Sequence, residues 1–415
     1  LKNGFSLTID DAVKSTIENN KKVQIALEKL NESKEILENA LGKKLPTVTA
    51  TLSGTYSNND TKTSVSDTTS ETFTDKYKIS ATQNLFDGGE KNFEIDRSKL
   101  LYENEIIKFY ETIQNLSLTA INGYLTVINY EKSLESNKKN FDSVSRFLQE
   151  TELKYNSGSA TIIDLMNSQT AFAIAESNLI SAEKNYELSL KTFKSIVGEE
   201  AIDLEDLVDL NRKIIFEDIL SSVIKDNFSI IISKNNIDIK KIELSKEKST
   251  NKPSIDLTAS TEYSDGGRID DGSETTNATI GVTITIPIFQ QNIDKSDIRK
   301  INSQILQSEI QHEDLKDILE IDVSNYFKDY SISIAKLKTS NIKIQYAKKL
   351  LITTMEEYNL GTKSITDLID AESQLLNANV EYYDANKNYL LNYFNLLALD
   401  GTLLKLFEES LPKFK

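Results

Sequence analysis

Two carboxylates follow a glycine turn in the second half of the sequence. In the stretch YNLGTKSITDLIDAE, residues 358–372, Asp367 and Asp370 are three positions apart and would therefore lie on one face of a helix. A similar stretch, YNSGSATIIDLMNSQ, occurs at 155–169, where Asn167 stands in place of the second acid. Carboxylates that share a face can bind hard cations, and carboxylate pairs also act as acid and base in hydrolases.

Helix capping is the simpler explanation for part of this pattern. Each turn has a glycine suited to the left-handed position that ends a helix, Gly158 in the first stretch and Gly361 in the second. Each also has an acid three residues after a hydroxyl side chain, as in a capping box, Asp164 in the first and Asp367 in the second. Capping and cation binding both stay open for Asp367, whereas Asp370 lies beyond the capping box.

The composition argues against several classes of function. The 415 residues carry a formal net charge of −16 and no cysteine, which argues against nucleic acid as a partner and removes thiolate chemistry. His312 is the only histidine, and no phosphate-binding loop accompanies the acids. We therefore predict that the chain is not an enzyme and needs no cofactor and no structural metal.

The two turns belong to an internal duplication. Tyr155 and Tyr358, like the glycines and acids that follow them, are 203 residues apart, which is about half of the chain. The sequence predicts a first structural repeat at 1–207 and a second at 208–415, each with a helix, two strands, a very long helix, a glycine turn and a shorter helix. Only four prolines and 14 glycines interrupt the chain, which favours long elements.

The helices that flank the turns show a heptad pattern. The predicted helices are the first ones of each repeat, at 8–44 and 216–250, the very long ones, at 88–155 and 291–357, and the shorter ones, at 161–197 and 364–399. In the shorter helices a large side chain recurs every seven residues and a small one follows three positions later. Strict sevens predict left-handed coiled-coil packing. At 1.5 Å per residue the very long helices would span on the order of 100 Å.

The predicted strands alternate between apolar and polar residues. They lie at about 46–57, 77–86, 254–264 and 278–289, and the segments within each pair are predicted to be polar, mobile loops. Their apolar face could pack against protein or against lipid. Four strands are too few to close a membrane barrel, and an open sheet edge in lipid is not tolerated, so such a barrel would be shared among several chains.

With the motifs LTIDDAVKSTIENN, LFDGGEKN and the two turn stretches, the chain resembles the TolC-like outer-membrane efflux protein family over nearly its whole length. The resemblance implies a mainly α-helical chain with a membrane β-barrel, in which a homotrimer builds a 12-stranded barrel from four strands per protomer. A long coiled-coil tunnel would continue this barrel from the Gram-negative outer membrane into the periplasm. The implied function is an exit duct for small molecules, for type I protein secretion, or for both. The implied partners are an inner-membrane pump of the RND or ABC type, a periplasmic adaptor protein and outer-membrane lipid.

The resemblance also gives the turn residues a role at the periplasmic entrance of the tunnel. Asp367 and Asp370 match inward-facing aspartates that threefold symmetry arranges in rings, which predicts a ring that cations can block. Tyr358 and Lys363 match a tyrosine and an arginine that hold this hairpin against its neighbour, and the tyrosine's partner is an aspartate at the position of Asp164. A lysine lacks the planar fork of an arginine, so this link is expected to be weaker.

One alternative from another class stays open at this point. A soluble periplasmic coiled-coil scaffold or adaptor would carry the same heptads, with its strand pairs forming a small sandwich. The sequence does not determine the transported substrate, the partner pump and adaptor, or the open or closed state of the entrance.

Overall fold

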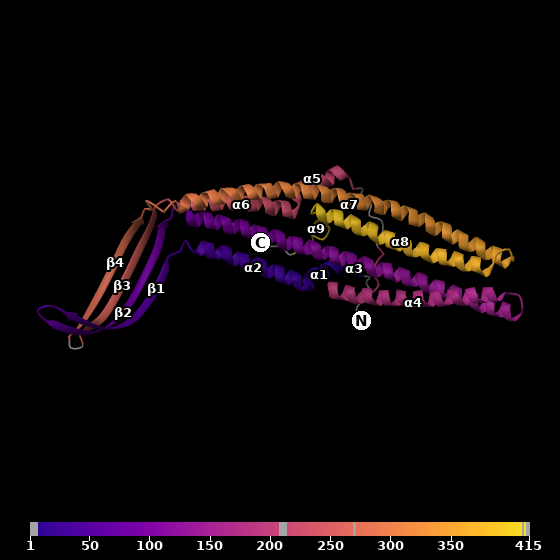
Figure 1. Cartoon of the computed structure of the whole chain (residues 1–415), viewed down its shortest axis with the longest axis horizontal. Helices are drawn as coiled ribbons and strands as arrows, with labels where there is room; N and C mark the ends of the chain where they lie inside the picture. The colour runs from indigo at the N-terminus through magenta and orange to yellow at the C-terminus, as the bar shows by residue number, and fades with distance from the viewer. Residues whose placement is uncertain (1–6, 207–213, 269–270, 409–410, 412–415) are drawn as a thin grey trace. The chain divides into compact units, whose positions relative to one another are not determined.

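The computed structural model describes residues 7–206, 214–268, 271–408 and 411, and Figure 1 shows its helices and strands. The elements of the first part of the chain are, in order, α1 (Ile9–Asn19), α2 (Lys21–Gly42), β1 (Thr47–Lys62), β2 (Asp67–Phe86), α3 (Glu90–Asn156) and α4 (Ile162–Val197). Those of the second part are α5 (Phe216–Asp226), α6 (Phe228–Ser249), β3 (Ser254–Arg268), β4 (Asp271–Thr285), α7 (Ile293–Asn359), α8 (Ile365–Leu399) and the short α9 (Leu403–Leu406). The two parts therefore repeat the same order of elements.

These elements fall into two compact units. The first, which we call the helical unit, comprises Leu1–Leu27, Ile107–Ile231 and Asp314–Lys415. The second, which we call the sheet unit, comprises Glu28–Ile106 and Ile232–Glu313. Within the described residues, no helix contains an apolar stretch long enough to cross a bilayer.

The sheet unit contains one antiparallel sheet with the strand order β1-β2-β3-β4. Leu52 pairs with Tyr77, and Tyr77 pairs with Tyr263, so that an apolar row crosses three strands on one face. The next residue along β2, Lys78, pairs with Glu262 on the opposite, polar face. The predicted alternation of faces is thus present, and the outer edges of β1 and β4 have no partner strand within the described residues.

The strands are longer than predicted, and the prediction of loops between them was wrong. β1 runs on to Lys62 and β2 begins at Asp67, while β3 and β4 leave only two residues between them. Hydroxyl side chains hold the polar ends together, for example Ser57 and Thr72 with 2.6 Å between their oxygens. Runs of Thr and Ser therefore continue a ladder where their polarity alone indicated loops. β4 instead ends early, at Thr285, two residues before a proline that has no N–H for the ladder.

The first helix of each repeat is interrupted, contrary to the prediction. α1 gives way to α2 at Asn20, and α5 to α6 at Asn227, both with extended backbone at ψ 128° and 134°. The Asn20 side chain accepts from the Lys22 N–H, and the Asn227 side chain from the Ser229 N–H, each at 2.9 Å. Each asparagine therefore ends one helix and caps the next, and the apolar period alone does not reveal such a break.

The core of the helical unit lies along the middle of α3. Ile113, Ala120 and Tyr124 are fully buried there, and the Tyr124 ring lies 6.3 Å from that of Phe193 on α4. The Tyr124 hydroxyl oxygen is 2.8 Å from the Leu7 carbonyl oxygen and 2.9 Å from that of Glu205. Burial raises its pKa to about 12. The small heptad residues of α4 and α8 are buried, as coiled-coil packing predicts: Ser168, Ala175, Ala182, Ser189, Ala371, Ala378 and Ala385.

The turn from β4 to α7 has left-handed residues that are not glycine. Gln291 and Asn292 have φ values of 54° and 61°, at the positions equivalent to Gly88 and Gly89 before α3. A side chain in this region costs free energy relative to glycine, although asparagine tolerates it better than most residues. The two repeats thus keep the same backbone path although their residues differ.

Candidate functional site

The candidate site consists of the two glycine turns and the first turns of α4 and α8, all within the helical unit. Figure 1 shows the α3–α4 and α7–α8 turns at the same end of this unit. Gly158 and Gly361 have φ values of 78° and 77°, and a Cβ atom at either position would meet nothing within 4 Å. Glycine is therefore favoured here by its left-handed backbone and not by lack of space.

Both capping boxes are formed. The Asp164 N–H donates to the Thr161 hydroxyl oxygen at 3.1 Å, and the Thr161 N–H donates back to the Asp164 carboxylate at 3.0 Å. At α8 the equivalent distances for Asp367 and Ser364 are 3.2 and 2.9 Å. Hydrogen bonds from Thr161 lower the pKa of Asp164, and those from Ser364 lower that of Asp367, because they favour the ionised carboxylates. Capping is thus one role of both aspartates.

The remaining charges of the second turn stay near the surface. Lys363 lies 3.7 Å from the Asp367 carboxylate, with 44% of its side chain exposed, so this ion pair adds little stability. Asp370 is exposed and lies one turn further along α8. Within the described residues, no group of three or more acids or histidines could hold a metal ion. A cation ring at Asp367 and Asp370 would therefore need carboxylates from further copies of the chain.

The Tyr358 side chain has a partner that the sequence did not indicate. Lys154 donates a hydrogen bond of 2.8 Å to the Tyr358 hydroxyl, and its Nζ also lies 4.4 Å from the centre of the Tyr358 ring. The Asp164 carboxylate, expected to bond Tyr358, instead accepts from Thr161 within its own turn. A signal for Lys154 existed in the sequence, since its counterpart in the second repeat is Glu357, a reversal of charge between otherwise similar turns.

Two further contacts hold the α3–α4 and α7–α8 hairpins together. Asn167 donates to the Thr366 hydroxyl at 3.2 Å. Phe147 of α3 packs with Ile365 and Leu368 of α8, all three at most 5% exposed, and Leu351, Tyr358 and Ile369 border this cluster. Together with the Lys154 bond, these contacts join the first repeat to the second at the turns.

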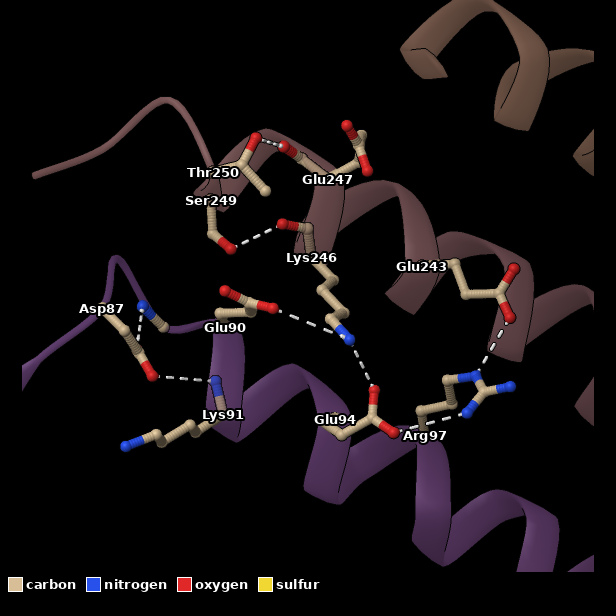
Figure 2. Close-up of polar contacts among 11 residues, drawn as sticks. Asp87, Glu90, Lys91, Glu94, Arg97, Glu243, Lys246, Glu247, Ser249 and Thr250 are labelled. Atoms are coloured by element: carbon tan, nitrogen blue, oxygen red, sulfur yellow. Dashed lines mark hydrogen bonds and ion pairs between the residues drawn. The ribbon is translucent and has the colours of Figure 1, made fainter. Parts of the chain in front are cut away.

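A second polar cluster, also missed from the sequence, joins the repeats within the sheet unit. Figure 2 shows Arg97 of α3 directed at Glu243 of α6, with 3.0 Å between nitrogen and oxygen. Lys246 of α6 reaches Glu94 of α3 at 2.8 Å, and its hydrogen bond lowers the Glu94 pKa. These side chains are 22 to 33% exposed, so their charges are partly shielded from water. Heptad patterns do not report such pairs, because the partners are about 150 residues apart in the chain.

Three comparisons place this geometry among known proteins. The family model described as outer membrane efflux protein matches residues 12–199 and 243–402. The chain is 24% identical to outer membrane protein TolC of Escherichia coli over 306 residues, which are 70% of this chain and 62% of that protein. It is 21% identical to the alkaline protease secretion protein AprF of Pseudomonas aeruginosa over 313 residues, 71% of this chain and 63% of that one. The chain thus matches less than two thirds of the length of these relatives.

Solved structures show the same fold. The CmeC outer membrane channel of Campylobacter jejuni superposes with a TM-score of 0.80 at 15% identity, covering 97% of this chain and 89% of that one. The outer-membrane channel OprN superposes with a TM-score of 0.79 at 13% identity, covering 95% and 90%. The predicted mainly α-helical fold with four strands per chain and the outer-membrane location are confirmed, and none of these relatives supports the soluble scaffold. The chain belongs to the outer membrane efflux protein family.

Proposed function

We propose that the chain is one protomer of an outer-membrane exit duct that works with an inner-membrane pump and a periplasmic adaptor. The observation that carries this proposal is a four-stranded sheet whose apolar face and outer edges have no partner within the described residues of one chain. Its apolar face is bare, with Val48 at 66% and Ile280 at 76% exposure, and the edges of β1 and β4 are unpaired within the described residues. Lipid on that face and neighbouring copies at both edges would satisfy it.

Three copies of this sheet would close a barrel of 12 strands. The polar face would then line the lumen, where Glu262 lies 3.9 to 4.0 Å from both Lys78 and Lys76. These lysines offset the acids Glu262 and Asp256, so the strands alone supply no net negative lumen. Any preference for cations would therefore arise elsewhere, and the acids of the α7–α8 turn are the candidates.

We assign the periplasmic entrance to the α7–α8 turn and its links to the first repeat. In a trimer, Asp367 and Asp370 would form two acidic rings, with Asp367 held by its capping box and Asp370 free of it. Tyr358 would then hold the closed hairpins together through Lys154, whereas Lys363 and Asp164 would stabilise their own turns. The internal duplication at 1–207 and 208–415 would give the tunnel two similar hairpins per protomer.

Efflux and protein secretion are both compatible with this arrangement. One relative is named for protease secretion and another is the outer membrane efflux protein BepC of Brucella suis, which is 20% identical over 329 residues. We propose no enzymatic reaction, because Asp164 and Asp367 serve as helix caps and Asp370 is exposed at the surface. The pump, whether of the RND or the ABC type, would select the substrate.

Mass measurement in detergent, followed by conductance in a planar bilayer, tests the duct. A trimeric particle that forms long-lived channels is the expected result. A folded monomer that stays soluble without detergent would contradict the shared barrel. A trimer that never conducts would contradict the duct but not the assembly.

A further inference from the structure

A buried acid lies just beyond the entrance turn. Glu372, the last residue of the second turn stretch, is 7% exposed, whereas none of the other glutamates of α3 and α8 is buried. Its counterpart in the first repeat is Gln169, which is exposed. A buried carboxylate at this position is therefore not a requirement of the repeated hairpin. Taking an ionised carboxylate out of water is costly unless its partners compensate.

The partners of Glu372 come from α3 of the other repeat. Ser143 and the positive charge of Arg146, both on α3, favour its ionised form. Burial outweighs both and raises the Glu372 pKa. Arg146 itself is exposed, which weakens its compensation. Elsewhere on α8, Asn167 of α4 donates to Thr366, and Lys343 of α7 pairs with Glu381 at 2.8 Å. Leu351 and the titratable Tyr358 of α7 border the Phe147 cluster.

The contact between α3 and α8 is partly polar near Glu372. Further up α3, most buried side chains are apolar, as at Ile113, Ile121 and Val127. From Asn129 onward, polar side chains are buried beside the apolar Val144 and Phe147, and Asn129 donates to Asp384 of α8 at 2.7 Å. The other buried polar side chains of this segment are Ser136, Asn137, Asn140 and Thr151. Because water can replace such hydrogen bonds at a net cost of only about 1 kcal/mol each, the polar part of this seam separates more easily than an apolar contact such as the Phe147 cluster.

We propose that Glu372 is a proton-controlled latch between α8 and α3. With a proton, the neutral carboxylic acid stays in the seam and the α7–α8 hairpin remains against the first repeat. Without it, the buried charge favours water, and the hairpin separates from α3. This proposal rests on the proposed entrance for its effect on conductance, whereas the separation of the hairpins can be measured independently of any channel.

The direction of the pH effect follows from the two states of the seam. The packed seam raises the Glu372 pKa, and an open seam would return it to its ordinary value in water. The proton therefore binds the packed state more tightly. The packed state is fully favoured below the ordinary glutamate pKa and loses this advantage as the pH rises through the raised pKa.

Disulfide formation between two introduced cysteines measures this separation. The Asn167 side-chain nitrogen and the Thr366 hydroxyl oxygen lie 3.2 Å apart across the two hairpins. The chain has no cysteine of its own. The rate of disulfide formation in N167C/T366C is measured from about pH 4 to 9, with and without Glu372→Gln. At each pH, the rate with Glu372 is divided by the rate with Glu372→Gln. This ratio cancels the intrinsic pH dependence of thiol oxidation.

We expect this ratio to be near one at low pH and to fall severalfold as the pH rises. Ser143→Ala removes a hydroxyl that favours the ionised form, so it should move the midpoint to higher pH. Gln169→Glu, the matched control in the first repeat, should leave the profile unchanged. A ratio of one at every pH, or a midpoint that Ser143→Ala does not move, would overturn the latch.

Conductance separates the latch from the duct. Wild-type channels should open more often as the pH rises, and Glu372→Gln channels should not. A pH-dependent disulfide rate without any conductance would retain the latch and reject the duct. Thermal unfolding of Glu372→Gln checks that the variant is folded, and Glu372→Asp should restore part of the pH dependence if a carboxylate is what the seam requires.

Discussion

Replacing Tyr358 by Phe removes one hydrogen bond from the proposed closed entrance and leaves the ring in place. The lost contact is the 2.8 Å bond from Lys154 to the Tyr358 hydroxyl. The aromatic ring still borders the Phe147, Ile365 and Leu368 cluster, and Lys154 can still lie over the ring face. Any change in gating would then report the hydroxyl alone.

The size of the effect follows from the exposure of this bond. Lys154 is exposed and Tyr358 is half-buried, so water replaces the bond in part. We take about 0.5 to 1 kcal/mol per protomer, the low end for a hydrogen bond. In a symmetric trimer that opens in one step, the three losses together amount to about 1.5 to 3 kcal/mol. Since about 1.4 kcal/mol is a factor of ten, the open fraction should rise roughly 10- to 100-fold from a small starting value.

Single-channel recording in a planar bilayer measures that open fraction directly. Tyr155→Phe, the matched change in the first repeat, should have no effect, since the bond from Lys154 is made to Tyr358. Lys154→Gln also removes the charge over the ring, so it should open the channel at least as much as Tyr358→Phe does. The double variant should open it no further than Lys154→Gln, because both changes remove the same hydrogen bond. An unchanged open fraction in Tyr358→Phe, or full additivity with Lys154→Gln, would refute the assignment of this bond to the closed state.

Three further predictions test other parts of the molecule. Trivalent or divalent cations added on the periplasmic side should block conductance, and Asp370→Ala should relieve the block with little loss of stability. The control is Asp164→Ala, which removes an equivalent helix cap in a turn that has no acid one turn further on. This variant should leave the block unchanged. Tyr124→Phe should destabilise the helical unit by about 1 to 2 kcal/mol, seen as a lower urea midpoint, because two carbonyl oxygens lose a buried donor. Glu262→Gln should leave reversal potentials in a salt gradient nearly unshifted or move them toward anions, whereas removing Asp367 and Asp370 together should abolish any cation preference. If Glu262→Gln abolished the preference and the removal of both aspartates did not, selectivity would be assigned to the barrel.

The capping boxes and glycine turns show how much local sequence can determine. A hydroxyl residue and an acid three positions later satisfy backbone groups within one helical turn, so no distant residue is needed. The left-handed glycines at 158 and 361 follow from the same local geometry. For this reason the ends of α4 and α8 agree with the prediction to within one residue.

The strand ends and the helix breaks were predicted less well. Thr and Ser runs such as those around Ser57 and Thr72 read as loops by composition, yet they pair once the neighbouring strand is present. The breaks at Asn20 and Asn227 interrupt an apolar period that itself continues. In the strands the deciding hydrogen bonds join separate segments of the chain, whereas each asparagine accepts from an N–H two residues on, which the apolar period does not record.

The amino-acid sequence by itself determined the duplication, the heptad packing, the alternating strands and the family, because these are recorded in periodicities and motifs along the chain. Only the tertiary structure brought Lys154 to Tyr358, paired Glu262 with two lysines, and buried Glu372 against Ser143 and Arg146. These contacts join residues from different repeats or different strands, and a carboxylate in a heptad pattern looks the same in sequence whether it faces water or a neighbouring helix. Its burial, and therefore its pKa, depends on which helix packs against it.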